Sequence, residues 1–272
     1  MVRSLWTAAT GMIAQQTNVD TIANNLANVN TNGYKTEVNE FKSLLYQNIQ
    51  ANTTTADGSQ KPVGAQVGLG VRNASITSIF KQGSLLDVES DSAFAIDGNG
   101  FFAVRGEDGE TYYTRNGNFQ WSLGNNNTMM LTNSDGLAVL DSTGKAITLD
   151  SSYVSSQITI SKDGTICYPD ESNNPASLGI TIGVYQFTNP GGLTKEGDSL
   201  FAVSDASGQA LNEATNTALK KSSVIQGYLE GSNVQVVDEM VNMIVAQRAY
   251  ELNSKAITAS DEMMQQANNL RR

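Results

Sequence analysis

LWTAATGMIAQQTNVDTIANNLANVNTNG, residues 5–33, is the stretch that decides the fold. Apolar or small side chains recur along it at the spacing of a heptad repeat, which predicts one long helix over about residues 4–29. These positions are Leu5, Ala8, Met12, Val19, Ile22, Leu26 and Val29, with Gln15 as the polar exception. Asn32 and Gly33 then end the helix, because both residue types accept the left-handed conformation that often follows one.

A second stripe of apolar or small side chains runs along the last forty residues. Ser232 and Gln235 match a capping box, so we expect this helix to begin at residue 232 and to run almost to the end of the chain. The stripe comprises Val237, Val241, Val245, Ala249, Leu252, Ala256, Ala259, Met263 and Leu270.

A single helix cannot bury its own apolar stripe. Each stripe therefore needs a partner surface, since most helical stability in proteins comes from tertiary packing. The simplest solution pairs the two helices with each other, in a coiled-coil-like manner, and covers the remaining apolar surface with other copies of the chain. An ordinary helical hairpin packed on its own sheet is the alternative that the pattern leaves open. The predicted assembly interface comprises Leu5, Met12, Val19, Ile22, Leu26, Val29, Val241, Val245, Leu252, Ala256 and Met263.

Between the helices the signals are those of strands and tight turns. Asp-Gly recurs at residues 97–98, 108–109, 135–136 and 163–164, and Asn-Gly stands at 116–117, which are dipeptides typical of hairpin turns. Short strand-like runs lie between them at residues 101–104, 111–114, 138–140 and 158–160, and the longest is 180–187. Residues 47–68 instead are rich in polar and small residues and are expected to form a long loop or extended arm.

The predicted fold class is therefore α+β, with two long terminal helices bracketing a hairpin-rich antiparallel β domain. We expect an N-terminal helix of an inner domain at 1–33, a connecting segment with a polar arm at 34–70, a β-rich outer domain at 71–231 and a C-terminal helix at 232–272.

Composition excludes several kinds of chemistry. The 272 residues include no histidine and one cysteine, Cys167, so neither a histidine-based catalytic or metal site nor an internal disulfide can form. The net charge is −10, of which −8 falls on residues 51–224, and this acidic middle argues against nucleic acid as a partner. We expect no enzymatic activity, no cofactor and no metal.

Hydropathy gives two further expectations. No stretch approaches the roughly 20 apolar residues of a membrane span, so we expect no membrane insertion. Thr, Gly and Gln interrupt the apolar residues near the N-terminus, so we also expect no cleaved signal peptide.

Two long motifs at opposite ends of the chain resemble the signatures of bacterial flagellar rod and hook axial proteins. The first is IANNLANVNTNGYK at residues 22–35, and the second runs from EGSNV at 230–234 through EMVNMI at 239–244 to QRAYE at 247–251. Gly100-Phe101-Phe102 and YTRNGNF at residues 113–119 resemble the β-domain markers of the family. The opening MVRSLW, with QQTN at 15–18, is most similar to the distal rod members, and a proximal rod or hook-type paralogue is the alternative.

The resemblance implies a structural subunit that assembles with itself into a rigid helical tube and transmits torque from motor to hook. Its terminal helices would form the inner tube and its β domain the outer layer. It implies proximal rod and hook proteins and the flagellar export apparatus as partners, and a rod of the basal body that crosses the periplasm as the location.

Two functions of other classes stay open on sequence grounds. A secreted adhesin or carbohydrate binder would need an exposed aromatic cluster, for which Tyr112, Tyr113 and Trp121 are the candidates. An enzyme built on a pair of carboxylates is the other, although nothing in the sequence singles out such a pair.

Overall fold

The computed structural model describes residues 2–50, 64–124, 128–170 and 174–270. Contacts between Cα atoms divide the chain into two compact units. The helical unit comprises Met1–Ala27, Glu37–Thr77 and Gln235–Arg272, and the β unit comprises Asn28–Thr36 and Ser78–Val234. The domain boundaries expected from the sequence, at residues 33, 70 and 231, stay a prediction, and the compact units divide at other residues.

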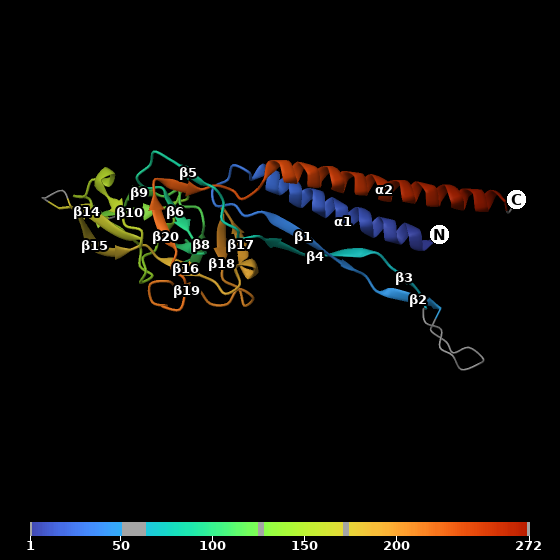
Figure 1. Cartoon of the computed structure of the whole chain (residues 1–272), viewed down its shortest axis with the longest axis horizontal. Coiled ribbons are helices and arrows are strands. Elements are labelled where there is room, and N and C mark those ends of the chain that lie inside the picture. Colours follow the sequence, from blue (N-terminus) through green and yellow to red (C-terminus); the bar gives the residue numbers. More distant parts are fainter. Residues whose placement is uncertain (1, 51–63, 125–127, 171–173, 271–272) are drawn as a thin grey trace, which may run out of the picture. The chain divides into compact units, whose positions relative to one another are not determined.

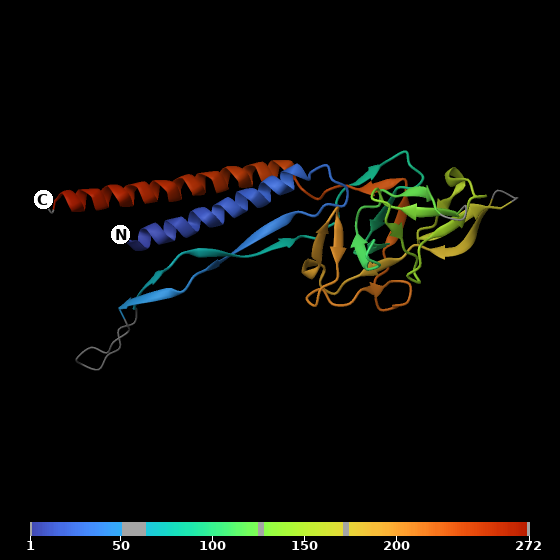
Figure 2. The same cartoon turned by 180° about the vertical axis from the view of Figure 1, so that it is seen from behind.

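Two long helices run side by side in opposite directions in the helical unit (Figures 1 and 2). They are α1 (Val2–Ala27) and α2 (Val236–Asn269). The fold is thus a mixture of helices and antiparallel strands in which an N-terminal and a C-terminal helix bracket a β region, as predicted.

The predicted capping box at the start of α2 is wrong. Gln235 is the N-cap residue of α2, and no side chain caps the helix. The Ser232 hydroxyl instead accepts a hydrogen bond from the backbone N–H of Val234 at 3.3 Å, so it closes a turn that ends before the helix begins.

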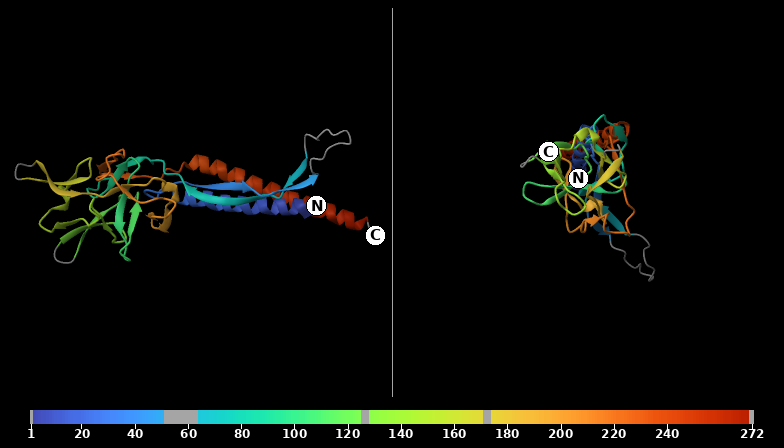
Figure 3. Two further views of the ribbon diagram at one scale, coloured as in Figure 1. Left: turned by 90° about the horizontal axis from the view of Figure 1, so that it is seen from below. Right: turned by 90° about the vertical axis from the view of Figure 1, so that its left-hand side faces the viewer.

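A narrow β ribbon completes the helical unit and lies along α1 (Figure 3). Its strands are β1 (Glu37–Ser43) paired with β4 (Val71–Ser78), and β2 (Tyr46–Gln50) paired with β3 (Ala65–Gly68). The segment expected to be a loop at 47–68 is therefore paired strand at both ends, because its backbone groups bond across the ribbon. Its middle, residues 51–63, lies outside the described residues.

The β unit is antiparallel throughout its described pairings. The main sheet has the order β12-β10-β11-β7-β8-β18-β17, with β9 beside β10, β16 beside β7 and β19 beside β16. Its strands are β7 (Phe101–Arg105), β8 (Thr111–Thr114), β9 (Gln120–Leu123), β10 (Thr128–Thr132), β11 (Ala138–Val139), β12 (Thr148–Asp150), β16 (Val184–Gln186), β17 (Thr194–Gly197), β18 (Leu200–Ala202) and β19 (Leu211–Asn212).

Smaller pairings surround this sheet. Strand β14 lies between β13 and β15, β20 pairs with β6, and β21 pairs with β5. Their bounds are β5 (Leu85–Asp87), β6 (Phe94–Asp97), β13 (Thr159–Ile160), β14 (Thr165–Pro169), β15 (Pro175–Thr181), β20 (Ser223–Gln226) and β21 (Tyr228–Glu230), with short 3₁₀ turns at Ser155–Gln157 and Pro190–Gly192.

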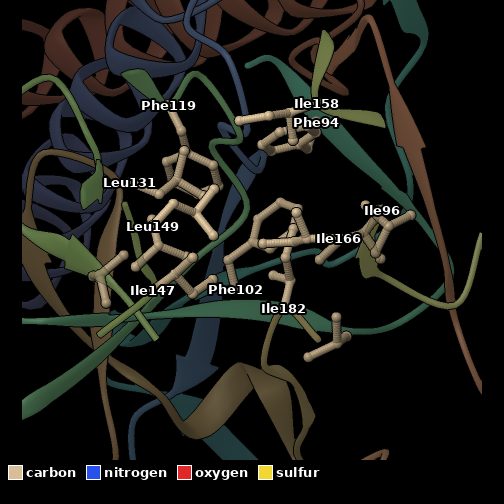
Figure 4. Packing of buried hydrophobic residues seen from close by; sticks show 14 residues of the cluster. Phe94, Ile96, Phe102, Phe119, Leu131, Ile147, Leu149, Ile158, Ile166 and Ile182 are labelled. Atoms are coloured by element: carbon tan, nitrogen blue, oxygen red, sulfur yellow. The ribbon is translucent and has the colours of Figure 1, made fainter. Parts of the chain in front are cut away.

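The core of the β unit is a cluster of aromatic and aliphatic side chains, in which Phe102, Phe119 and Leu131 lie close together (Figure 4). The rings of Phe102 and Phe119 meet edge to face, with centroids 5.1 Å apart, which is a favoured aromatic geometry. The predicted aromatic candidates belong to the interior of the β unit: Tyr112 and Trp121 are partly buried against this cluster, and Tyr113 is buried in a second cluster with Phe101 and Phe201.

Three Asp-Gly dipeptides, at residues 108–109, 135–136 and 163–164, lie between neighbouring strands that pair with each other, as predicted. The hairpin turns predicted at 97–98 and 116–117 are wrong, because among the described strands β6 pairs with β20 and not with β7, and β8 does not pair with β9. Gly136 has φ of 83°, as expected of a glycine in an Asp-Gly turn. Gly117 has no positive φ and is needed because an added Cβ would collide with the carbonyl oxygen of Phe94. The long strand expected at 180–187 is two strands, since β15 ends at Thr181 and β16 begins at Val184.

Candidate assembly interface

The two helices meet along a seam of small and polar side chains. On α1 the seam positions are Ser4, Gly11, Asn18 and Asn25, and on α2 they are Glu239, Ala246, Asn253 and Ser260, both sets spaced by seven residues. Three contacts fix the order: Ser4 Oγ lies 3.2 Å from Ser260 Oγ, Gly11 abuts the Asn253 side chain, and Asn25 Nδ2 donates to Glu239 Oε2 at 3.3 Å. Ala246 is 1% exposed on the same face of α2.

Asn25 joins three elements of the helical unit. Its Nδ2 also donates to the backbone carbonyl of Glu37 at 2.9 Å, and its Oδ1 accepts the backbone N–H of Glu37 at 2.9 Å. The carboxamide therefore satisfies both backbone groups at the start of β1 and still reaches the buried carboxylate of Glu239. This arrangement ties the end of α1, the start of β1 and the first turn of α2 together.

The apolar stripe of α2 does not take part in the seam. Val241, Val245, Leu252, Ala256 and Met263 all lie exposed, with 62% of Val245 and 66% of Leu252 accessible to solvent. At 3.6 residues per turn, the stripe positions lie between about 60° (Ala256 and Met263) and about 160° (Val241) around the helix from the neighbouring seam positions. Exposed leucine, valine and methionine side chains along one side of a helix are typical of surfaces that contact another molecule.

The predicted residues of α1 are placed differently. Ile22 is buried at 4% exposure, and Leu5, Met12, Val19 and Leu26 are partly buried. Val29 follows the end of α1 and belongs to the β unit, where it is partly buried. Val19 and Tyr250, with Gln16, Gln247 and Glu251, line a shallow groove of about 410 Å³ along the helix pair.

Two exposed apolar surfaces of the helical unit were missed by the sequence analysis. Trp6 and Ile13 lie one heptad apart on α1 and are 69% and 65% exposed, outside the predicted stripe. In the ribbon, Leu45 and Ile49 are 82% and 59% exposed. The sequence did not reveal the strands of this ribbon, because they are short and many of their residues are polar, so apolar and polar side chains do not alternate clearly.

A buried ionic cluster joins three segments of the β unit, and the composition did not predict it. Glu230 Oε1 lies 2.6 Å from Lys35 Nζ, and Glu230 Oε2 lies 3.2 Å from Arg115 Nη1. The backbone N–H of Gly83 also donates to Glu230 Oε1 at 2.9 Å. Burial lowers the pKa of Lys35, an effect that the Glu230 carboxylate opposes, and burial likewise lowers the pKa of Arg115.

Asn233 ties neighbouring segments of the β unit together in the same way as Asn25 does in the helical unit. Its Oδ1 accepts the backbone N–H and the hydroxyl of Thr36, each at 2.7 Å. Its Nδ2 donates to the carbonyl oxygens of Ile79 and Lys81. Lys35, Glu230 and Asn233 all fall inside the two terminal motifs, so these motifs include residues that hold the β unit together.

Within the described ranges, no group of three or more Asp, Glu, His or Cys side chains is arranged to hold a metal ion. Within the same ranges, no helix is long and apolar enough to cross a membrane.

Three family models match successive parts of the chain. The model described as "Flagella basal body rod protein" matches residues 5–35, "Flagellar hook protein FlgE/F/G D1 domain" matches 95–168, and "Flagellar basal body rod FlgEFG protein C-terminal" matches 225–270. Paired terminal helices around an antiparallel β region, with these three matches in order, define a flagellar axial protein of the rod and hook class.

Full-length relatives narrow the assignment. The chain is 44% identical over 274 residues to the flagellar basal-body rod protein FlgG of Borreliella burgdorferi, with 100% of both chains covered. It is 40% identical over 273 residues to the protein of that name in Caulobacter vibrioides, covering 99% of this chain and 100% of the relative. The chain belongs to the flagellar basal-body rod protein FlgG family, and it is a structural subunit of the distal rod in the flagellar basal body. A proximal rod or hook-type paralogue is not favoured.

Proposed function

We propose that the chain assembles with other copies of itself into a rigid helical tube that transmits torque from motor to hook. The observation that carries this proposal is the apolar stripe of α2, which the chain's own α1 leaves exposed. Burying one Val, Leu or Met side chain contributes about 1.5–3 kcal/mol, so a stripe of several such residues is a strong drive to associate.

In this proposal the two helices pair in a coiled-coil-like manner inside each subunit. The heptad spacing of the seam and the contacts of Ser4, Gly11 and Asn25 support the pairing. The predicted interface residues then divide into two groups. Val241, Val245, Leu252, Ala256 and Met263 face a second copy, whereas Ile22 stabilises the subunit itself and Leu5, Met12, Val19, Leu26 and Val29 contribute to both.

The remaining parts of the proposal follow from membership of the family. The helical unit forms the inner layer of the tube and the β unit the outer layer. Proximal rod and hook proteins adjoin the ends of the rod, which crosses the periplasm, and subunits reach the growing tip through the flagellar export apparatus. The chain acts by rigidity and catalyses no reaction.

Electron microscopy and sedimentation of the purified chain over a range of concentrations test self-assembly. We expect ordered tubes or stacked rings at high concentration from the wild-type chain. Leu252→Asp places a charge in the stripe and should abolish them, because a buried unpaired charge is costly. Thr258→Asp is the matched control, since Thr258 is exposed on α2 away from the stripe. Assembly of Leu252→Asp at wild-type concentration would contradict the proposal.

A further inference from the structure

The three-stranded sheet of the β unit has an outer strand without charged side chains. In the parts of the chain that the structure describes, β15 pairs with β14 alone, so its other edge faces away from the sheet. The seven residues of β15, PASLGIT, include no Lys, Arg, Asp or Glu, and residues 175–177 and 179 are exposed. Long, uncharged and exposed edges are those that pair most readily with strands of other molecules. By contrast, β17, at one end of the main sheet, carries Lys195 and Glu196.

The direction of the backbone groups of β15 follows from its ladder with β14. The backbone N–H of Asp170 donates to the carbonyl oxygen of Asn174 at 2.9 Å, so this is a hydrogen-bonded pair. Bonded and non-bonded pairs alternate along an antiparallel ladder, which places Pro175 and Ser177 at non-bonded positions. The backbone groups of these two residues therefore point away from β14, towards the open edge.

This edge offers few hydrogen-bond donors to another strand. Pro175 has no backbone N–H, and the backbone N–H of Gly179 donates to Ser177 Oγ at 3.1 Å. Gly179 also has a φ of 75° and lies where the pairing register with β14 shifts, so the strand is irregular at this point. Among residues 175, 177 and 179, Ser177 alone keeps a backbone donor that faces outward.

The opposite edge of the same sheet is also bonded by a side chain. Gln226 Oε1 accepts the backbone N–H of Ile160 at 2.9 Å, and Gln226 Nε2 donates to the carbonyl oxygen of Ile158 at 2.9 Å. These backbone groups lie on the side of β13 that faces away from β14, because the backbone N–H of Ser161 bonds to the carbonyl oxygen of Thr165 in the ladder. The Gln226 carboxamide thus occupies the place of a further strand.

We propose that the outer edge of β15 is a latent site for strand addition by the β15 edge of a second copy, and that Pro175 and the Ser177 hydroxyl keep it closed. Two such edges, antiparallel and with Ser177 opposite Ser177, would bring Pro175 of one copy to Gly179 of the other. That contact needs the donor that Pro175 lacks and the donor that Ser177 occupies. An added strand gains its affinity from main-chain hydrogen bonds, so the loss of these donors disfavours the pairing.

The consequence for the tube rests on the proposed function, whereas the closure itself does not. Pairing of two identical antiparallel edges is two-fold symmetric and ends at a dimer, whereas a helical tube grows through head-to-tail contacts. An open β15 edge would therefore compete with assembly by joining β units in pairs.

Two variants that differ at one side chain test the closure. Both carry Pro175→Thr, which restores a backbone donor, and Leu252→Asp, which stops tube formation under the proposed function. One adds Ser177→Val, and the matched control adds Ser177→Thr, which has nearly the shape of valine but keeps a hydroxyl for the Gly179 N–H. Analytical ultracentrifugation of the full chain gives each dimer dissociation constant, and hydrogen exchange of residues 174–181 at low and high concentration shows where the copies meet.

We expect the Ser177→Val protein to dimerise about tenfold more tightly, or more, than the Ser177→Thr protein, because the freed Gly179 donor adds one hydrogen bond from each copy. Hydrogen exchange of residues 174–181 should slow in the Ser177→Val protein at concentrations where the control stays monomeric. Ser177→Ala, in place of Ser177→Val, frees the same donor with a smaller side chain and should also dimerise more tightly than the control.

Equal dissociation constants for the control and for the Ser177→Val and Ser177→Ala proteins would overturn the proposal. Dimers that leave the exchange of residues 174–181 unchanged would also overturn it, since the copies would then meet elsewhere. Tubes that form despite Leu252→Asp would count against the proposed function alone, because the compared proteins share the same helices and are measured below the concentration at which tubes form.

Discussion

The Lys35 ammonium and the Glu230 carboxylate form a buried ion pair within the β unit, 2.6 Å apart, with side-chain exposures of 1% and 0%. Arg115 shares the same carboxylate through Glu230 Oε2. Three segments distant in the sequence are thereby held at one point, and removal of the shared carboxylate would leave two cations without their main partner.

Glu230→Gln should therefore lower the free energy of unfolding of the β unit by about 3–5 kcal/mol, the usual effect of leaving buried charge uncompensated. Urea unfolding followed by tryptophan fluorescence measures the change, since Trp121 packs against the β core. Glu89→Gln, at an exposed position, is the control and should have almost no effect. A Glu230→Gln protein as stable as wild type would show that the ion pairs add nothing.

Tyr113 gives a prediction for alkaline pH. Burial raises the pKa of Tyr113 to about 12 from 10.0, so the folded protein keeps the phenol proton that the unfolded chain releases. The stabilisation is fully present below pH 10 and should be lost as pH rises towards 12, by at most about 2–3 kcal/mol. The stability of wild type relative to Tyr113→Phe should therefore fall in this range, whereas Tyr250→Phe, on the surface of α2, should follow wild type. Parallel curves for wild type and Tyr113→Phe above pH 10 would contradict the assignment.

Leu26→Asp tests the partly buried apolar edge of α1. A charge there would be desolvated by assembly, which is costly, so motility and tube formation should be lost. The β unit should remain folded, as judged by its resistance to protease. Ala27→Asp, at the exposed next position, is the matched control and should keep motility. If a strain carrying Leu26→Asp were motile, this edge of α1 would not be part of the assembly interface.

Deleting part of the polar arm expected at residues 47–68 tests which contacts make the rod stiff. We expect deletion of residues 47–62, part of which lies outside the described residues, to leave both helices and the β unit folded. The exposed Leu45 and Ile49 side chains make this ribbon a candidate for contact with a neighbouring subunit in the proposed tube. Rods from the deletion mutant should be curved or flexible in electron micrographs, because an arm lying between subunits would lock their spacing. Straight rods would place the stiffness in other contacts.

The sequence determined most of the secondary structure and the class of protein. Heptad spacing marked both helices, with α1 ending at Ala27 and not near Val29. Three of the four Asp-Gly dipeptides marked hairpins, because only a few residue types accept a positive φ, whereas the one at 97–98 did not, since β6 pairs with β20. The short strands of the ribbon were missed, since polar residues on a ribbon that is mostly exposed give no alternating pattern.

The tertiary structure alone decided which face of each helix meets the other. An apolar stripe in the sequence does not identify the surface that it contacts. In the structure the stripe of α2 is exposed and does not face α1. The pairing instead uses Asn25, Glu239 and small residues between them, which carry no hydrophobic periodicity. Lys35, Arg115 and Glu230 are likewise 80 and 115 residues apart along the chain, and their ion pairs exist only because folding brings them together.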